Sequence, residues 1–163
     1  MKKLLGSLAL LVLIVGLVPS AQAILIDRGG GMIYSTDLDV TWLQDANYAM
    51  TSNYDSDGLM TWQQATDWVE NLTFGGYDDW RLPTFDPAHP DARIEPTSPM
   101  HEMGYLNYVE LGNPRDAGGN PQNQGFFINM VPAPDSQEPW YWSGTPGDDD
   151  PTNTAWRFCF ECG

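Results

Sequence analysis

Residues 75–84 read Gly-Gly-Tyr-Asp-Asp-Trp-Arg-Leu-Pro-Thr, and they stand between a helical pattern and a proline-rich segment. Within this stretch Trp80 and Leu82 alternate with Arg81, which is typical of a short strand. Pro83 lacks a backbone N–H and therefore marks the end of that strand. The sequence thus predicts a helix, a glycine turn and a short strand in this order.

Arg81 is one of the few positively charged residues in this chain, so the group that neutralises it indicates whether its role is structural or functional. We expect Arg81 to form a structural ion pair with a neighbouring carboxylate, with Asp78 and Asp79 among the candidates. A clamp for a substrate carboxylate is the alternative interpretation.

The clearest helix lies just before this stretch, over residues 61–71. Thr61 can cap it, and Gln64 three residues later completes a capping box. Apolar residues fall on one helical face at spacings of three and four: Trp62, Ala65, Trp68, Val69 and Leu72. We expect Gly75-Gly76 to stop this helix.

The N-terminal part, residues 24–45, predicts two short strands. Residues 32–34 and 40–43 are rich in β-formers, with glycines at 29–31 before them, and we expect a hairpin. Asp55 and Asp57 follow in an Asp-x-Asp-Gly stretch. The later ligands of a calcium loop are missing there, so a turn is expected.

The segment after Pro83 is mostly loop. Asp86, His89 and Asp91 lie close together and could hold a metal, but a solvated loop is the favoured interpretation. Ser98-Pro99 is expected to open a second helix. Its apolar face would comprise Met100, Met103, Tyr105, Tyr108, Val109 and Leu111, and it would end at Gly112.

The C-terminal part predicts a second hairpin. Residues 126–128 are expected to form a buried strand or turn, and residues 140–145 a core strand. Residues 148–153 form an acidic loop, and residues 155–160 alternate in polarity like a returning strand.

The N-terminus has the pattern of a signal peptide over residues 1–23. Lys2 and Lys3 are followed by an apolar run and by Ala21-Gln22-Ala23, a small-x-small cleavage site. The apolar run is short for a membrane-spanning helix. We therefore expect export, contact with the membrane only during export, and a periplasmic or secreted domain over residues 24–163.

The composition of that domain excludes some functions. Removal of residues 1–23 leaves 140 residues with five arginines, no lysine and 22 carboxylates, a net charge of −17. Such a charge repels nucleic acid, whereas a cation, a neutral glycan or a basic surface remains a suitable partner. Seven Trp, seven Tyr and six Phe indicate a folded aromatic core under many glycine- and proline-rich turns.

Several motifs together resemble a known family. They are Thr61-Trp62-x-x-Ala65, residues 75–84, Tyr141-Trp-Ser-Gly-Thr145 and Ala155-Trp156, in that order, preceded by residues 28–34 and 41–45. The chain resembles the Lcl C-terminal domain family, exported bacterial domains of unknown function named for a collagen-like adhesin. The motif residues, to which the resemblance gives a structural role, are Trp62, Trp80, Arg81, Leu82, Pro83, Trp142, Ser143, Gly144 and Trp156.

The resemblance implies a C-type-lectin-like α+β fold, with two helices, short antiparallel strands and long loops. It also implies a final strand after Trp156, and we expect the chain up to Gly163 either to replace this strand or to lack it through truncation. The adhesin of this family binds sulfated glycans. This binding is not expected here, because the domain is so strongly acidic.

Two sites remain as hypotheses. Asp148, Asp149, Asp150 and Asn153 could hold Ca²⁺ and so coordinate sugar hydroxyls, or could form a solvated loop. Cys159 and Cys162 are expected to form a disulfide outside the cytoplasm, with free or intermolecular thiols as the second reading and redox chemistry as the third.

These observations favour a noncatalytic binding or adhesion module, with carbohydrate or a cell-surface component as its partner. A structural envelope or surface domain without a small ligand is the alternative. An oxidase resembling the formylglycine-generating enzymes, which share the broad fold, is the enzymatic alternative, and only the cysteine pair speaks for it.

Overall fold

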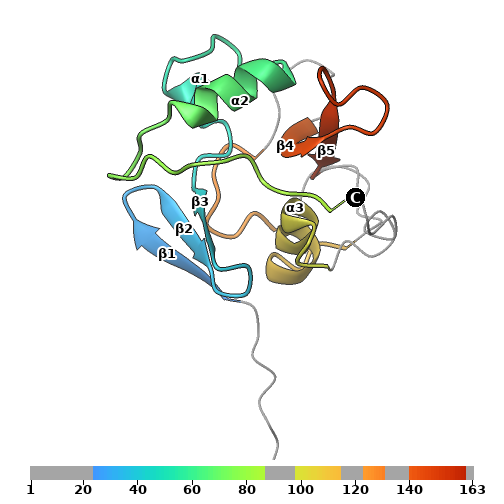
Figure 1. Ribbon diagram of the computed structural model, residues 1–163. Helices are drawn as coiled ribbons and strands as arrows, with labels where there is room; N and C mark the ends of the chain where they lie inside the picture. Colours follow the sequence, from blue (N-terminus) through green and yellow to red (C-terminus); the bar gives the residue numbers. More distant parts are fainter. Residues whose placement is uncertain (1–23, 87–97, 115–122, 131–139, 161–163) are drawn as a thin grey trace, which may run out of the picture.

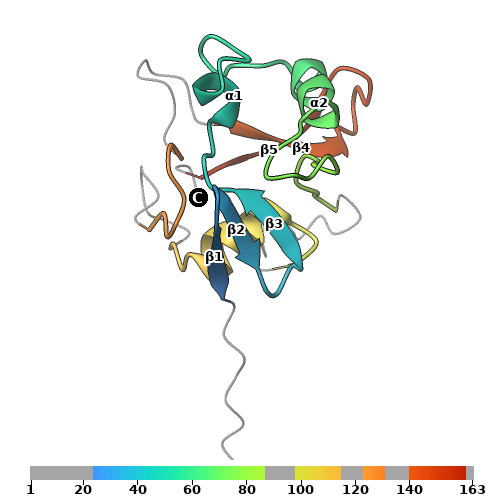
Figure 2. The same ribbon diagram turned by 90° about the vertical axis from the view of Figure 1, so that its left-hand side faces the viewer.

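The computed structural model describes residues 24–86, 98–114, 123–130 and 140–160. Two small antiparallel sheets and a few short helices make up these parts, so the fold is α+β, as expected. The three-stranded sheet lies at one end, α1 and α2 at the other, and the two-stranded sheet beside α2 (Figures 1 and 2). No helix within these ranges is long and apolar enough to span a membrane.

The N-terminal sheet has the order β1-β2-β3, from β1 (Leu25–Gly29), β2 (Met32–Ser35) and β3 (Val40–Leu43). The sequence predicted two strands here, and this was wrong because β1 is a third strand. Since β1 is almost wholly exposed, its residues do not alternate between buried and exposed positions. Gly30 and Gly31 form the two-residue turn between β1 and β2 with φ of +63° and +81°. Such turns need positive φ at both positions, which glycine adopts without strain.

The C-terminal sheet is the hairpin that the sequence predicted. β4 (Trp140–Pro146) pairs antiparallel with β5 (Ala155–Cys159), and Tyr141 lies opposite Phe158. Residues 126–128 were predicted to form a buried strand or turn, and this was wrong for two of the three residues. Only Phe127 is buried, and Ile128 forms a single parallel bridge with Asp45.

Helix α2 (Trp62–Glu70) confirms the predicted capping box, since the Thr61 side chain accepts from the Gln64 N–H and Gln64 reaches back to the Thr61 backbone. The helix ends at Glu70, with Asn71 as its C-cap, before the glycines. Gly75 and Gly76 instead form a separate turn between Phe74 and Tyr77, so their predicted role as the helix stop was wrong. A further short helix, α1 (Tyr48–Thr51), was not predicted.

The second predicted helix begins later than Ser98-Pro99. Helix α3 (Glu102–Tyr105) starts after His101, whose Nδ1 accepts a hydrogen bond from the Gly104 N–H at 3.0 Å. It continues as the π-helical turn η2 (Leu106–Glu110) and stops before Gly112, which has a φ of +67°. Since Met100 lies outside the helix, its side chain is exposed rather than part of the apolar face.

The core joins both sheets through α3 and η2. It consists of Ile33, Met103, Leu106, Leu111, Phe127, Met130, Phe158 and Phe160. Phe158 packs edge-to-face against both His101 and Phe160, with ring centroids 5.2 and 4.8 Å apart. The aromatic core predicted from composition is therefore present.

Candidate functional site

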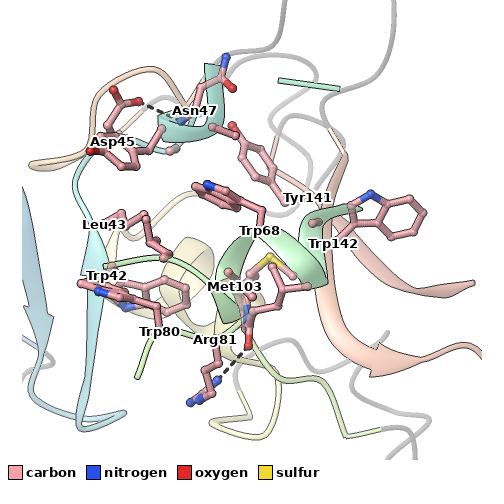
Figure 3. A pocket seen from close by; sticks show the side chains of 18 of the residues that line it. Trp42, Leu43, Asp45, Asn47, Trp68, Trp80, Arg81, Met103, Tyr141 and Trp142 are labelled. Atoms are coloured by element: carbon pink, nitrogen blue, oxygen red, sulfur yellow. Dashed lines mark hydrogen bonds between the residues drawn. The ribbon is translucent and has the colours of Figure 1, made fainter. Parts of the chain in front are cut away.

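A cavity of about 1210 Å³ opens between β3, α2 and β4. The segment of residues 77–83 and the start of α3 complete its wall (Figure 3). Ligand pockets in proteins have volumes of roughly 300–1,000 Å³, so the space here is large enough for a small-molecule ligand.

Ten aromatic side chains line the cavity. They are Trp42, Tyr48, Trp68, Tyr77, Trp80, Phe127, Trp140, Tyr141, Trp142 and Phe160. Buried side chains such as Met103, Leu106 and Met130 form its interior end. Leu59, Tyr77 and Trp140 also line it and are 57%, 54% and 38% exposed, which places apolar surface within reach of solvent.

Two tryptophans of the sequence motif fasten α2 to β4 in a reciprocal manner. The Trp62 indole N–H donates to the Ser143 carbonyl at 3.0 Å, and the Trp142 indole N–H donates to the Met60 carbonyl at 2.9 Å. Buried tryptophans need such partners, because an unpaired indole N–H is costly. These contacts hold the wall of the cavity between α2 and β4 in place.

The motif segment is fixed between β4 and α3, and it is not a strand. Its backbone meets β4 at the Pro83 carbonyl, which accepts from the Gly144 N–H at 2.8 Å. Gly144 is close-packed there, since a Cβ atom on it would lie 3.5 Å from both the Leu82 Cβ and the Leu82 carbonyl. The predicted strand over residues 80–82 was wrong because this stretch forms no strand ladder.

Arg81 forms the expected ion pair, but its partner is Glu102 at the start of α3, and not Asp78 or Asp79. Two hydrogen bonds of 2.8 and 2.6 Å join the guanidinium group to the two carboxylate oxygens, and they raise the pKa of Arg81. Because Glu102 already neutralises this arginine, Arg81 is poorly suited to bind the carboxylate of a substrate. The ion pair instead fixes the segment of residues 77–83 to the start of α3.

The remaining motif residues lie near these contacts. Ser143 is fully buried, and the Trp156 ring packs against Phe85 with centroids 4.6 Å apart. Trp80 donates its indole N–H to the Phe74 carbonyl at 3.2 Å and packs edge-to-face on the Phe74 ring. Five of the nine motif residues thus line the cavity: Trp80, Arg81, Leu82, Pro83 and Trp142.

Sequence reasoning missed the cavity itself. Trp42 was interpreted only as part of a strand and Trp68 only as part of a core face, whereas both line the cavity. The indole Nε1 of Trp42 is buried and has no hydrogen-bond partner in the described part of the chain. No spacing in the sequence brings β3 and α2 together, so this arrangement needed the tertiary structure.

Asp45 organises the wall beside α1. Its carboxylate accepts from the Asn47 N–H at 2.9 Å, the Thr51 hydroxyl at 2.7 Å and the Asn129 amide at 3.0 Å. These bonds connect the end of β3 to α1 and to residue 129. Asp45 is therefore already satisfied by the protein.

The predicted calcium-binding loop lies apart from the cavity lining. Asp148, Asp149, Asp150 and Asn153 are exposed, and the Asp150 carboxylate accepts from the Asn153 amide at 3.0 Å. This bond and those from backbone N–H groups lower the pKa of Asp150. Within the described ranges, no group of three or more His, Cys, Asp or Glu side chains is arranged to hold a metal, and Ca²⁺ binding stays a prediction.

Other predicted site residues fall partly outside the described ranges. His89, Asp91 and Cys162 are among these, so the metal reading of the first two and the disulfide partner of Cys159 are not tested. Cys159 itself is 4% exposed at the end of β5. The Asp55-x-Asp57-Gly stretch forms the expected turn, in which the Asp55 carboxylate accepts from the N–H groups of Asp57 and Gly58.

The fold and the site define a small α+β domain built around an aromatic cavity. The chain belongs to the Lcl C-terminal domain family, whose sequence pattern matches residues 31–163. This match confirms the resemblance based on the tryptophan-containing motifs. No curated protein and no solved structure matches the chain.

Proposed function

We propose that this protein is a noncatalytic binding or adhesion module that acts outside the cytoplasm, in the periplasm or after secretion, and binds carbohydrate in the aromatic cavity. The signal-peptide pattern of residues 1–23 supports the location. Membership of the Lcl C-terminal domain family supports an exported domain. The observation that carries the proposal is the aromatic lining of a cavity of about 1210 Å³.

The chemistry of sugars suits such a cavity. A sugar ring has an apolar face that stacks on aromatic side chains, and hydroxyl groups at its edge that need hydrogen-bond partners. Tyr77 and Trp140 offer exposed aromatic surface, and the exposed carboxylates of Asp57 and Asp79 line the same cavity. Acceptors beside aromatic rings are what sugar hydroxyls require.

We further propose that the fold is a variant of the C-type-lectin-like arrangement. Two small antiparallel sheets and helices α2 and α3 support it, as does the stretch of residues 71–86, which forms no helix or strand. A disulfide between Cys159 and Cys162 would fasten the end of β5 in an oxidising compartment. Mass spectrometry after alkylation of the unreduced protein tests this disulfide.

Binding is tested on a glycan array with the secreted protein, with and without Ca²⁺. We expect binding to a defined set of oligosaccharides, and we expect Tyr77→Ala and Trp140→Ala to reduce it at least about tenfold, as loss of stacking surface does at such sites. Phe126→Ala is the matched control, because Phe126 is 46% exposed but does not line the cavity.

The outcomes separate the proposal from its alternative. Absence of binding to all glycans, in a protein shown to be folded by near-ultraviolet dichroism, would favour a structural envelope domain. Equal losses in the Phe126 variant would exclude the cavity as the binding site.

A further inference from the structure

The cavity lining contains more carboxylates than arginines, and this excess of negative charge indicates a positively charged ligand. We propose that the bound glycan carries protonated amino groups, as oligosaccharides of amino sugars with free amines do. This inference rests on the proposed function and narrows it to one class of carbohydrate.

The three arginines that line the cavity are each engaged by the protein. Arg81 is paired with Glu102 through two hydrogen bonds. Arg28 lies 3.9 Å from the centroid of the Tyr34 ring and donates to the Thr41 hydroxyl at 3.2 Å. A sulfate or carboxylate on a ligand would have to compete with these contacts.

Arg157 is the third, and its guanidinium carbon lies 4.3 Å from the centroid of the Trp140 ring. A cation on an aromatic face is stabilised by the ring quadrupole. Trp140 is also part of the exposed surface at the cavity. The protein thus already places a positive charge on an aromatic ring of this site.

Carboxylates outnumber the arginines in the lining. The lining contains five carboxylates and three guanidinium groups, which leaves a formal charge of −2. The carboxylates are Asp39, Asp45, Asp57, Asp79 and Glu102. Asp57 and Asp79 are exposed, and within the described ranges neither has a cationic side chain as an ion-pair partner. Two such negative charges in a lining that also contains aromatic rings favour a ligand with positive charge.

The charge of the whole domain acts in the same direction. Residues 24–163 carry a net charge of −17, which attracts cations over a distance and repels sulfated chains. A local charge of the same sign at the cavity then determines where an attracted cation binds. Long-range attraction and local contacts therefore select the same class of ligand.

The test compares two oligosaccharides of equal length that differ in charge and in the N-acetyl groups that remove it. Oligomers of glucosamine carry free amines, whereas oligomers of N-acetylglucosamine are neutral. We expect the secreted protein to bind the glucosamine oligomer at least about tenfold more tightly in calorimetry, and this preference to shrink at high salt because ion pairs are screened.

Two variants locate the effect. Asp79→Asn should weaken binding of the glucosamine oligomer several-fold more than binding of the N-acetylated oligomer, because the amide keeps an oxygen that accepts from a sugar hydroxyl and only the charge is lost. Asp148→Asn removes the same charge from the exposed acidic loop outside the cavity lining, and it should alter neither.

The results distinguish this inference from the function on which it rests. Equal affinity for both oligomers, or equal effects of the two variants, would overturn the inference and leave a carbohydrate-binding cavity. Binding of sulfated oligosaccharides in preference to both would also overturn it. Failure to bind any glycan would overturn the proposed function as well.

Discussion

Arg81 and Glu102 form a bidentate ion pair that joins the Trp-Arg-Leu-Pro-Thr stretch of residues 80–84 to the first turn of α3. The pair is asymmetric, because the Arg81 side chain is 51% exposed and the Glu102 side chain is only 9% exposed. Glu102 Oε2 also accepts from the Thr84 N–H at 2.7 Å. The buried carboxylate is therefore satisfied by three donors from one segment, and its position at a helix N-terminus adds to its stability.

We expect Glu102→Gln to lower the free energy of unfolding by about 2 kcal/mol, because hydrogen bonds to charged groups are worth more than neutral ones and the amide NH₂ cannot accept from Arg81. Urea denaturation measures the change. Asp79→Asn is the control, since it removes a nearby exposed carboxylate, and it should change stability by less than about 0.5 kcal/mol. Equal effects of the two variants would contradict the role of the pair.

The reciprocal tryptophan contacts between α2 and β4 give a second prediction. Trp62→Phe removes the donor to the Ser143 carbonyl and should destabilise the protein by about 1–2 kcal/mol, because Ser143 is fully buried. Thermal unfolding measures this. Trp68→Phe provides the comparison, since the described part of the chain shows no hydrogen bond from the Trp68 indole, and a similar loss there would mean that ring size alone matters.

Much of the fold follows from local sequence patterns. The capping box at Thr61 and the hairpin after Trp140 depend on neighbouring residues, and both were predicted correctly. The start of α3 was not, because His101 caps it through Nδ1, and histidine is not among the usual capping residues. Strand β1 was missed because an exposed edge strand carries no alternation of burial.

The candidate site was far less predictable than the fold. The acidic loop was predicted as a calcium site because its charged residues are consecutive. In the structure the Asp150 carboxylate instead accepts a hydrogen bond from the Asn153 amide within a local turn. The cavity combines Trp42 of β3, Trp68 of α2 and Trp142 of β4, which are far apart in the chain. Patterns of hydrophobic residues identify these side chains as inward-facing, but they do not reveal that the space between them is left open.

His101 is predicted to remain neutral well below its ordinary titration range. Burial lowers its pKa from 6.5 to about 4, and its ring lies edge-to-face against Phe85 and Phe158. Because the pKa of His101 is lower in the folded state than in the unfolded chain, burial of the neutral ring stabilises the fold fully at pH values above the unfolded pKa. This stabilisation is lost as the pH falls from about 6.5 toward about 4, and the total loss is about 3 kcal/mol.

An NMR titration of the imidazole Cε1–H resonance tests this prediction directly. We expect a midpoint near pH 4 for as long as the protein stays folded. The chain has two histidines, so His89→Gln assigns the resonance of His101. A midpoint near the ordinary value would show that the ring is accessible to water in solution.

Glu110 has the opposite dependence on pH. Its Oε1 accepts from the Ser35 hydroxyl at 2.5 Å, whereas its Oε2 is buried with no partner in the described part of the chain. Burial raises the pKa of Glu110, and the charge of Asp37 adds to this effect. Asp37 in turn accepts from the Tyr105 hydroxyl at 2.7 Å, so two acids and a tyrosine meet between the β2–β3 turn and the α3–η2 helix.

Because the folded pKa of Glu110 is raised, the folded state holds this proton more tightly than the unfolded chain. Its contribution to stability is present below the unfolded pKa and is lost as the pH rises through the folded pKa. We therefore expect Glu110→Gln, which stays uncharged, to be about 1 kcal/mol more stable than the wild type at neutral pH, because an unpaired buried charge is removed. This difference should vanish toward about pH 4, as followed by urea denaturation at a series of pH values.

Glu70→Gln removes the same charge from an exposed position on α2 and controls for the general repulsion in so acidic a domain. A difference that is independent of pH, or equal in both variants, would show that Glu110 is hydrated in solution and titrates like a surface carboxylate.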